Sequence, residues 1–337
     1  MSPADATTTG PTVAPDPRAL GLTTDTTVSC RLAHRRTTEG VFVTGVARDG
    51  ARLVALAQLP RLHRLHNDGD GGHHDTLLVA EVLRQAIEVI AHRLLDVPVA
   101  SHFVLRAVDI RVDDPRALVA DGGAAEIVVA LHADQARRNR RGAVYAVDGP
   151  VRSWIGGRPA VTLGGSVAFL TAEAYEGMRG VAAGLPRARP DLLAQAAPPA
   201  VVGRSVPGNV LITNSSGPPD AATATVLPVG HPAFFDRPLD HYPGMMIAEA
   251  TRQLAVASVA TGTRLPGAVL RTTAATFDFV SFAELDRELS CRVTDWSREQ
   301  SGHTVTVRAE QVERDGAAAR LVCESRFHLV PDGPVRS

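Results

Sequence analysis

The longest apolar stretches of the chain are two segments, residues 75–95 and 244–261, in which hydrophobic side chains fall on nearly every side of a helix. Such a helix is typical of a buried element rather than of one that lies on a surface. We therefore predict two buried helices. Shorter runs rich in β-branched and apolar residues predict strands: residues 41–44, 126–131, 143–147, 160–170, 210–213, 289–293, 304–312 and 321–330.

The two predicted helices carry the same motif. Residues 77–86 read LLVAEVLRQA and residues 245–254 read MMIAEATRQL, so that 168 positions (249 − 81) separate the two glutamates. A constant separation of this kind indicates an internal duplication. It also relates other residue pairs: Arg36 to Arg204, Leu59-Pro60 to Leu227-Pro228, His63 to His231, His73 to His241, Arg84 to Arg252 and Gln85 to Gln253.

The order of elements, one strand, one buried helix and then several strands, occurs twice and is typical of the hotdog fold. We predict an α+β tandem (double) hotdog, each unit a long buried helix wrapped by an antiparallel sheet. Such an internal pseudo-dimer predicts a monomer or a homodimer of tandems. The expected boundaries are a disordered tail at 1–27, units at 28–175 and 200–332, a linker at 176–199 and a tail at 333–337.

Composition narrows the possible functions. The chain has 337 residues, of which 45% are hydrophobic and 21% charged, with a net charge of −1. These values predict a globular protein without general affinity for nucleic acid or membranes. Every basic residue besides histidine is arginine, which excludes Schiff-base and P-loop lysines. The three cysteines are far apart and no signal peptide begins the chain, so we expect a cytoplasmic location.

Neither a metal nor another cofactor is predicted. Four histidines surround a loop of glycine and aspartate, but their spacing matches no common ligand pattern: they are His63, His66, His73 and His74. No G-x-G-x-x-G motif opens a helix, which argues against nicotinamide binding.

Polar residues on the buried helices are the first candidates for chemistry. Glu249, Arg252 and Gln253 share one face of the second helix because they lie at positions i, i+3 and i+4. An unpaired buried carboxylate costs several kcal/mol, and Arg252 is its natural partner. One interpretation is therefore a structural ion pair that joins the two units, and the other is an active-site carboxylate.

The start of the second helix offers a second kind of chemistry. Pro243 suits the first helical position, and Gly244 allows a ligand close to the backbone. The first amide N–H groups of a helix lack internal acceptors, so those of Gly244 and Met245 form a potential oxyanion hole. His241 and His231 lie just upstream, and either histidine or Glu249 is a candidate base.

Residues 231–253, HPAFFDRPLDHYPGMMIAEATRQ, resemble the hotdog dehydratases of fatty-acid synthesis and, more closely, the A-factor biosynthesis family of γ-butyrolactone synthases. The closer resemblance rests on DRPLDHYPGM and E-x-x-R-Q. It implies a tandem of two hotdog units that moves a β-ketoacyl group from acyl carrier protein to a hydroxyl of dihydroxyacetone phosphate. The product would be the precursor of a γ-butyrolactone-type, furan or butenolide signalling molecule.

The resemblance also assigns roles to residues. It places Glu249, Arg252 and Gln253 on the family's helix signature, with first-unit counterparts Glu81, Arg84 and Gln85. Arg252 and Arg271 are the predicted phosphate ligands. Two other functions stay open: a hotdog dehydratase or thioesterase, and a non-catalytic protein that binds acyl chains or lactones.

The two helix starts differ in sequence. Where the second unit has Pro243-Gly244, the first has Asp75-Thr76. A carboxylate at Asp75 would cap the first helix and compete for its N–H groups. We therefore expect Glu249 to serve turnover, and Glu81 to serve mainly stability or the lining of the other unit's pocket.

Overall fold

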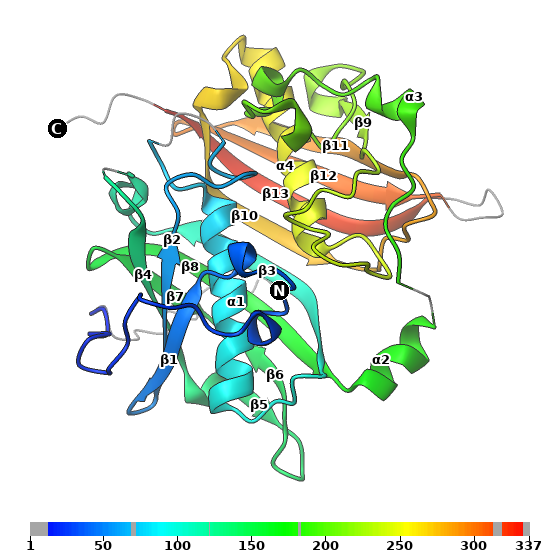
Figure 1. The fold of residues 1–337 in the computed structure, drawn as a ribbon. Coiled ribbons are helices and arrows are strands. Elements are labelled where there is room, and N and C mark those ends of the chain that lie inside the picture. The colour runs from blue at the N-terminus through cyan, green and yellow to red at the C-terminus, as the bar shows by residue number, and fades with distance from the viewer. Residues whose placement is uncertain (1–12, 69–71, 121, 181–182, 313–318, 333–337) are drawn as a thin grey trace, which may run out of the picture.

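The computed structural model describes residues 13–332 apart from 69–71, 121, 181–182 and 313–318. Within them, two long helices, α1 (Thr76–Leu94) and α4 (Gly244–Thr263), each lie against their own set of strands (Figure 1). Both helices begin and end within two residues of the predicted bounds, and both are buried as predicted. The tandem hotdog prediction is thereby confirmed at the level of its central elements.

Antiparallel strands make up the rest of both units. The first unit contains β1 (Val43–Asp49), β2 (Arg52–Leu59), β3 (His102–Val112), β4 (Ala125–His132), β5 (Ala136–Arg138), β6 (Val144–Asp148), β7 (Val151–Ile155) and β8 (Arg158–Leu170). The second contains β9 (Thr223–Thr225), β10 (Leu270–Phe279), β11 (Leu289–Arg298), β12 (His303–Gln311) and β13 (Arg320–Pro331).

One sheet runs through both units in the described part of the chain. Its order is β1-β2-β4-β7-β8-β3-β10-β13-β12-β11-β9, with β6 beside β8 and β5 beside β6. The units join where β3 pairs antiparallel with β10, from Ala107–Asp278 to Arg111–Ala274. This continuous ladder satisfies the backbone groups of two strands that would otherwise be exposed edges. The predicted joining of the two sheets is confirmed.

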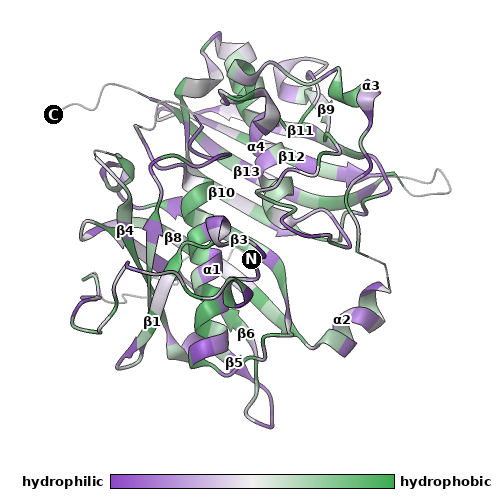
Figure 2. Cartoon of the chain, viewed as in Figure 1, coloured by the Kyte–Doolittle hydropathy of each residue, from purple (hydrophilic) through white to green (hydrophobic). Residues whose placement is uncertain are grey.

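The hydrophobic core is continuous from one unit to the other. It includes the inward faces of α1 and α4 and the strands that pack on them. Figure 2 shows hydrophobic residues along much of α1 and along strands of both units. Each fully buried aliphatic side chain contributes about 1.5–3 kcal/mol to folding, so the helices anchor their units.

Two predicted segments differ from the structure. Residues 13–27, expected to be disordered, lie along the outer face of the first sheet, where Leu22 is buried beside Trp154. The predicted strand 210–213 forms only isolated bridges, because the amide of Leu211 donates to the side chain of Gln253 at 2.8 Å. A buried glutamine thus takes one backbone bond of this segment, while Leu211 and Thr213 still pair with residues 225–227.

The expected linker contains two short helices. They are α2 (Ala172–Arg179), which begins before the predicted linker, and α3 (Pro190–Leu193). Residues 1–12 and the predicted tail at 333–337 lie outside the described residues. No helix in the described part of the chain has the length and apolar character needed to cross a membrane.

Candidate functional site

Glu81 lies on the buried face of α1, surrounded by donors. Its carboxylate accepts hydrogen bonds from Arg84 at 2.7 and 2.8 Å and from Gln85 at 2.8 Å, and it pairs with Arg35. Burial alone would raise the pKa of Glu81, but Arg35 and Arg84 outweigh it and hold the pKa well below its usual range. Glu81 is therefore an ionised anchor for two arginines.

Glu249 makes the equivalent contacts on α4. It is fully buried, and it accepts hydrogen bonds from Arg204 at 2.9 and 2.6 Å, from Arg252 at 3.0 Å and from Gln253 at 2.7 Å. The predicted ion pair of Glu249 with Arg252 is confirmed.

The arginine that precedes each helix departs from the predicted pairing. Arg35, rather than Arg36, is the counterpart of Arg204, a separation of 169 positions (204 − 35). Arg36 is exposed, and its backbone N–H donates to Asp236 of the second unit. The duplication therefore shifts register by one residue between this segment and the helices.

The two ion-pair clusters join the units reciprocally. Arg35 donates to the backbone oxygen of Ala233 in the second unit at 3.0 Å. Arg204 donates to the backbone oxygen of His66 in the first unit at 3.1 Å. Each cluster therefore contacts the loop that precedes the opposite helix.

At the Glu249 cluster, the opposite helix start is closed by a carboxylate. Asp75 caps α1 by accepting from the amide of Leu77 at 2.7 Å, as predicted, and it also pairs with Arg252 at 3.0 Å. It lies 3.7 Å from Arg204. Burial, and secondarily the charge of Asp75, raise the pKa of Glu249 to about 7, against the effect of Arg204. Acidic and basic side chains fill this cluster.

At the Glu81 cluster, the start of the second unit's helix, α4, is open. Pro243 precedes α4, and no side chain caps it. A cleft of about 560 Å³ separates the start of α4 from α1. Its walls include Glu81, Arg84, Gly244 and Met245, and thus come from both units. The amide N–H groups of Gly244 and Met245 have no acceptor within the helix, and both residues line this cleft.

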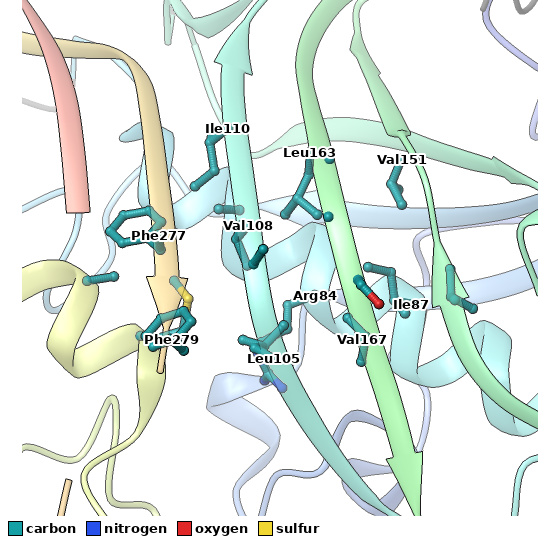
Figure 3. Close-up of a pocket in the computed structure, with 18 of the residues that line it drawn as sticks. Arg84, Ile87, Leu105, Val108, Ile110, Val151, Leu163, Val167, Phe277 and Phe279 are labelled. Carbon is teal, nitrogen blue, oxygen red and sulfur yellow. The ribbon is translucent and has the colours of Figure 1, made fainter. Parts of the chain in front are cut away.

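A smaller apolar pocket lies behind the cleft, between α1 and the sheet (Figure 3). Its volume is about 30 Å³, and aliphatic and aromatic side chains line nearly all of it. Arg84, Leu105, Met245 and Phe279 border both the cleft and the pocket. These four residues separate a polar cleft from an apolar interior.

Positive charge gathers on the inner wall of the cleft. Arg35, Arg84 and Arg237 all line it, together with the carboxylates of Glu81 and Glu88. Burial lowers the pKa of Arg237, Asp236 raises it, and the nearby charges of Arg84 and Arg35 lower it further. Because like charges are crowded here, a bound anion would be favoured.

The mouth of the cleft is held by a second polar network. Asp240 accepts hydrogen bonds from Arg179 at 2.7 Å and from the hydroxyl of Tyr175 at 2.9 Å, and it contacts His241 Nδ1 at 2.9 Å. Arg179 also pairs with Glu284 at 2.8 Å. These contacts dock α2, part of the expected linker, onto the second unit.

The sequence comparisons agree with this architecture. The model of the A-factor biosynthesis hotdog domain matches residues 21–154 and 186–326. The chain belongs to the A-factor biosynthesis hotdog family. Two curated relatives are named 2-oxo-3-(phosphooxy)propyl 3-oxoalkanoate synthase. The Streptomyces coelicolor protein is 32% identical over 68% of this chain and 71% of its own. The Streptomyces virginiae protein is 31% identical over 77% and 85%.

Solved hotdog structures are more distant. A hot dog fold protein of unknown function from Alicyclobacillus acidocaldarius is 14% identical, with a TM-score of 0.44, over 86% of this chain and 97% of that one. An acyl-ACP thioesterase from Bacteroides thetaiotaomicron is 12% identical, with a TM-score of 0.43, over 82% and 97%.

The site residues predicted from the sequence separate into two groups. The cleft brings together Glu81, Arg84, His241, Gly244 and Met245. The others do not line it: they are Gln85, His231, Glu249, Arg252, Gln253 and Arg271.

The residues outside the cleft have other partners. His231 is buried and contacts Asn209 at 3.0 Å. Arg271, on β10, pairs with Asp332 at 2.7 Å. Arg252 is committed to Glu249 and Asp75, so neither predicted phosphate ligand is part of the open site.

The sequence analysis also missed residues that line the cleft. Arg237 lies within the DRPLDHYPGM segment that carries the family resemblance, but upstream of the helix whose periodicity indicated the candidate residues. Glu88 lies seven positions after Glu81, about two helical turns, and so shares its face. That spacing was the available signal.

Proposed function

We propose that this protein is a 2-oxo-3-(phosphooxy)propyl 3-oxoalkanoate synthase. It is an acyltransferase that moves a β-ketoacyl group from an acyl-carrier-protein thioester to a hydroxyl of dihydroxyacetone phosphate. The observation that carries the proposal is the cleft, in which unopposed helix amides, clustered arginines and an adjoining apolar pocket meet. These features match an acyl thioester and a phosphorylated acceptor, and the named relatives support the same reaction.

The acyl thioester enters with its carbonyl oxygen at the amides of Gly244 and Met245. Charge that develops on this oxygen in the tetrahedral intermediate is stabilised by the two N–H groups and by the positive end of the α4 dipole. The acyl chain points past Met245 and Phe279 into the apolar pocket. Because that pocket measures only about 30 Å³, its side chains move apart when a chain enters.

The phosphate of the acceptor binds at Arg237. This guanidinium donates to the backbone oxygen of His34 and contacts Asp236, while Arg84 and Arg35 add positive charge to the same wall. Arginine suits a phosphate because it donates in pairs of parallel hydrogen bonds. This assignment replaces the predicted ligands Arg252 and Arg271.

Turnover belongs to the Glu81 side of the molecule in this proposal, whereas the sequence led us to expect it at Glu249. The open start of α4 faces Glu81, whereas Glu249 faces the closed start of α1. Glu81 holds Arg35 and Arg84 in place for the acceptor. Glu249 helps to hold the two units together.

The reaction forms a carbon–oxygen ester bond and breaks the carbon–sulfur bond of the thioester, and the hydroxyl proton passes to the departing thiolate. The product is the ester precursor of a γ-butyrolactone-type, furan or butenolide signalling molecule. The three cysteines are free thiols, which fits the predicted cytoplasmic location.

The test is incubation of the protein with a β-ketoacyl thioester, on carrier protein and on coenzyme A, and with dihydroxyacetone phosphate. We expect the phosphorylated ester by mass spectrometry, and much less ester from dihydroxyacetone itself. Free β-keto acid formed without any acceptor would favour a thioesterase. Loss of water from a 3-hydroxyacyl thioester would favour a dehydratase. Binding of the acyl chain or of a lactone without turnover would favour a non-catalytic binding protein.

A further inference from the structure

Glu88 is a buried carboxyl group on the wall of the cleft, and the proposed reaction gives it no role. Only 2% of the residue is exposed. One oxygen, Oε1, pairs with Arg84, and the other, Oε2, has no hydrogen-bond partner among the described residues. Glu88 lines the cleft, and its unpartnered oxygen is closed off from solvent, so a substrate hydroxyl group reaches it when the adjoining side chains move.

Glu88 also breaks the internal symmetry of the molecule at the open site. Its counterpart at the separation of 168 positions is Val256, in the closed cluster (88 + 168 = 256). Glu81, Arg84 and Gln85 all have matching residues on α4, but Glu88 does not. A carboxyl group that is present only where the cleft is open is better explained by the cleft than by the joining of the units.

A chain of hydrogen bonds through His92 fixes the protonation of His34, the histidine next to Glu88. His92 Nδ1 lies 2.8 Å from the backbone oxygen of Val97, which can only accept, so this nitrogen carries the hydrogen. His92 Nε2 is then an acceptor, and His34 Nε2, at 2.9 Å, donates to it. Burial, with the neighbouring His92, lowers the pKa of His34 to about 3, so His34 is neutral.

The neutral form of His34 leaves a lone pair on Nδ1. This nitrogen lies 4.0 Å from Glu88 Oε1. A protonated Glu88 can donate to the lone pair after a small movement, whereas an ionised Glu88 meets no donor there. The two histidines therefore favour the protonated carboxyl, while Arg84 holds the ionised form in position.

We propose that Glu88 is the general base of acyl transfer, with the hydrogen-bonded pair His34 and His92 as the residues that position it. Glu88 accepts the hydroxyl proton of dihydroxyacetone phosphate as the oxygen attacks the thioester carbon. It returns the proton to the thiolate when the carbon–sulfur bond breaks. This inference rests on the proposed function and adds the group that moves its proton.

The charges around Glu88 agree with that role. Burial raises its pKa to about 7, against the attraction of Arg84 and with the repulsion of Glu81. Arg35 and Arg237, from segments packed against α1, oppose the rise more weakly. A base whose pKa lies near neutrality accepts and returns a proton efficiently.

His241 is the other proton acceptor on the cleft wall. Its Nδ1 is held by Asp240 in the network that docks α2 at the mouth, and its side chain is 24% exposed. Glu88 lies beside Arg84 and near Arg237, where the phosphate of the acceptor binds. The arginine wall that would hold the phosphate in this proposal therefore carries Glu88 rather than His241.

The test compares Glu88→Gln with wild type in the ester-forming assay across pH 5–9. Glutamine keeps the shape and an acceptor for Arg84 but cannot take a proton. We expect kcat to fall by about a hundredfold or more while KM for dihydroxyacetone phosphate changes by only a few-fold. The wild-type rate should rise with pH through a midpoint near 7, and the variant should show no such rise. Glu126→Gln, which removes an exposed carboxylate on β4, is the control.

A second variant tests the histidine pair without removing the base. In His92→Phe, His34 can carry its proton on Nδ1 and donate to ionised Glu88, so the midpoint should fall by about half a unit or more. A merely structural role would change Tm and leave the midpoint in place. If Glu88→Gln does not fold, this shift decides the matter, and an unchanged midpoint overturns the proposal.

The outcomes separate the two levels of inference. If wild type forms the ester and Glu88→Gln keeps its rate and pH profile, Glu88 is not the base and the proposed function stands. If His241→Gln, rather than Glu88→Gln, abolishes the pH dependence, the base is His241. If wild type forms no ester, the proposed function fails and the role of Glu88 falls with it.

Discussion

Asp75 at the start of α1 and Arg252 on α4 form an ion pair of 3.0 Å across the two units. This pair closes the start of one helix, whereas the start of the other faces a cleft of about 560 Å³. The two duplicated halves have thus diverged at equivalent positions: the first has Asp75 where the second has Pro243.

Replacement of Asp75 should weaken folding without affecting acyl transfer. Asp75→Asn keeps a side-chain cap for Leu77 but loses the charge that pairs with Arg252, and we expect a loss of about 1–3 kcal/mol. Asp75→Ala also loses the cap, at a further cost of about 1 kcal/mol. Denaturant unfolding measures both. A rate per folded enzyme below that of wild type would place Asp75 in the active site.

Glu249 and Glu81 should respond differently to substitution. Glu249→Ala leaves Arg204 and Arg252 short of a buried partner and should cost about 3–5 kcal/mol of stability. Below its Tm, the folded fraction should retain acyl transfer. Glu81→Gln should lower acyl transfer at least tenfold, because Arg35 and Arg84 lose the charge that positions them. Rates normalised to the folded fraction provide the comparison, and equal losses in both variants would contradict the assignment.

Arg237 should govern recognition of the phosphate. Arg237→Gln is expected to raise KM for dihydroxyacetone phosphate about tenfold or more, since a charge-assisted hydrogen bond contributes about 1.5–3 kcal/mol. The activity with dihydroxyacetone should change little. Arg271→Gln is the matched control, because Arg271 pairs with Asp332 away from the cleft. A phosphate preference that survives in Arg237→Gln would locate the anion site elsewhere.

Gly244 should tolerate no side chain without loss of function. A Cβ at this position would lie 3.3 Å from the ring of Phe279, which borders both the cleft and the apolar pocket. Gly244→Ala should push that ring toward the acyl chain and lower kcat/KM most for long acyl donors. Gly177→Ala, in α2, meets no atom within 4 Å and is the control. Equal kinetics for short and long donors would show that Phe279 does not border the acyl path.

The buried carboxyl of Glu88 should make stability depend on pH. Its folded pKa of about 7 lies above the usual value of 4.5, so the folded state binds the proton more tightly than the unfolded state. Stability from this group is present below about pH 4.5 and is lost as pH rises toward 7. The difference between wild type and Glu88→Gln should therefore change by about 1–3 kcal/mol over that range. A difference that is constant with pH would mean that Glu88 is ionised throughout.

Much of the fold could be predicted from the sequence because its strongest signals are local. Helices that are apolar on all sides must be buried wherever they pack, and a constant separation of motifs reports duplication directly. The capping role of Asp75 was predictable for the same reason, since a cap bonds to an amide two residues away. The pairing of Arg35 with Glu81 was not, because it depends on a one-residue shift in a segment far from the helix.

By itself, the sequence determined the two buried helices, the duplication and the residue types on each helix face, since these follow from periodicity and spacing along one chain. Only the tertiary structure decided which glutamate meets which helix start. The units pack so that α1 faces the start of α4, and this crossing joins Glu81 to Gly244 in the open cleft and Glu249 to Asp75 in the closed cluster. Contacts between residues more than a hundred positions apart are set by how the sheets join at β3 and β10, which no local pattern encodes.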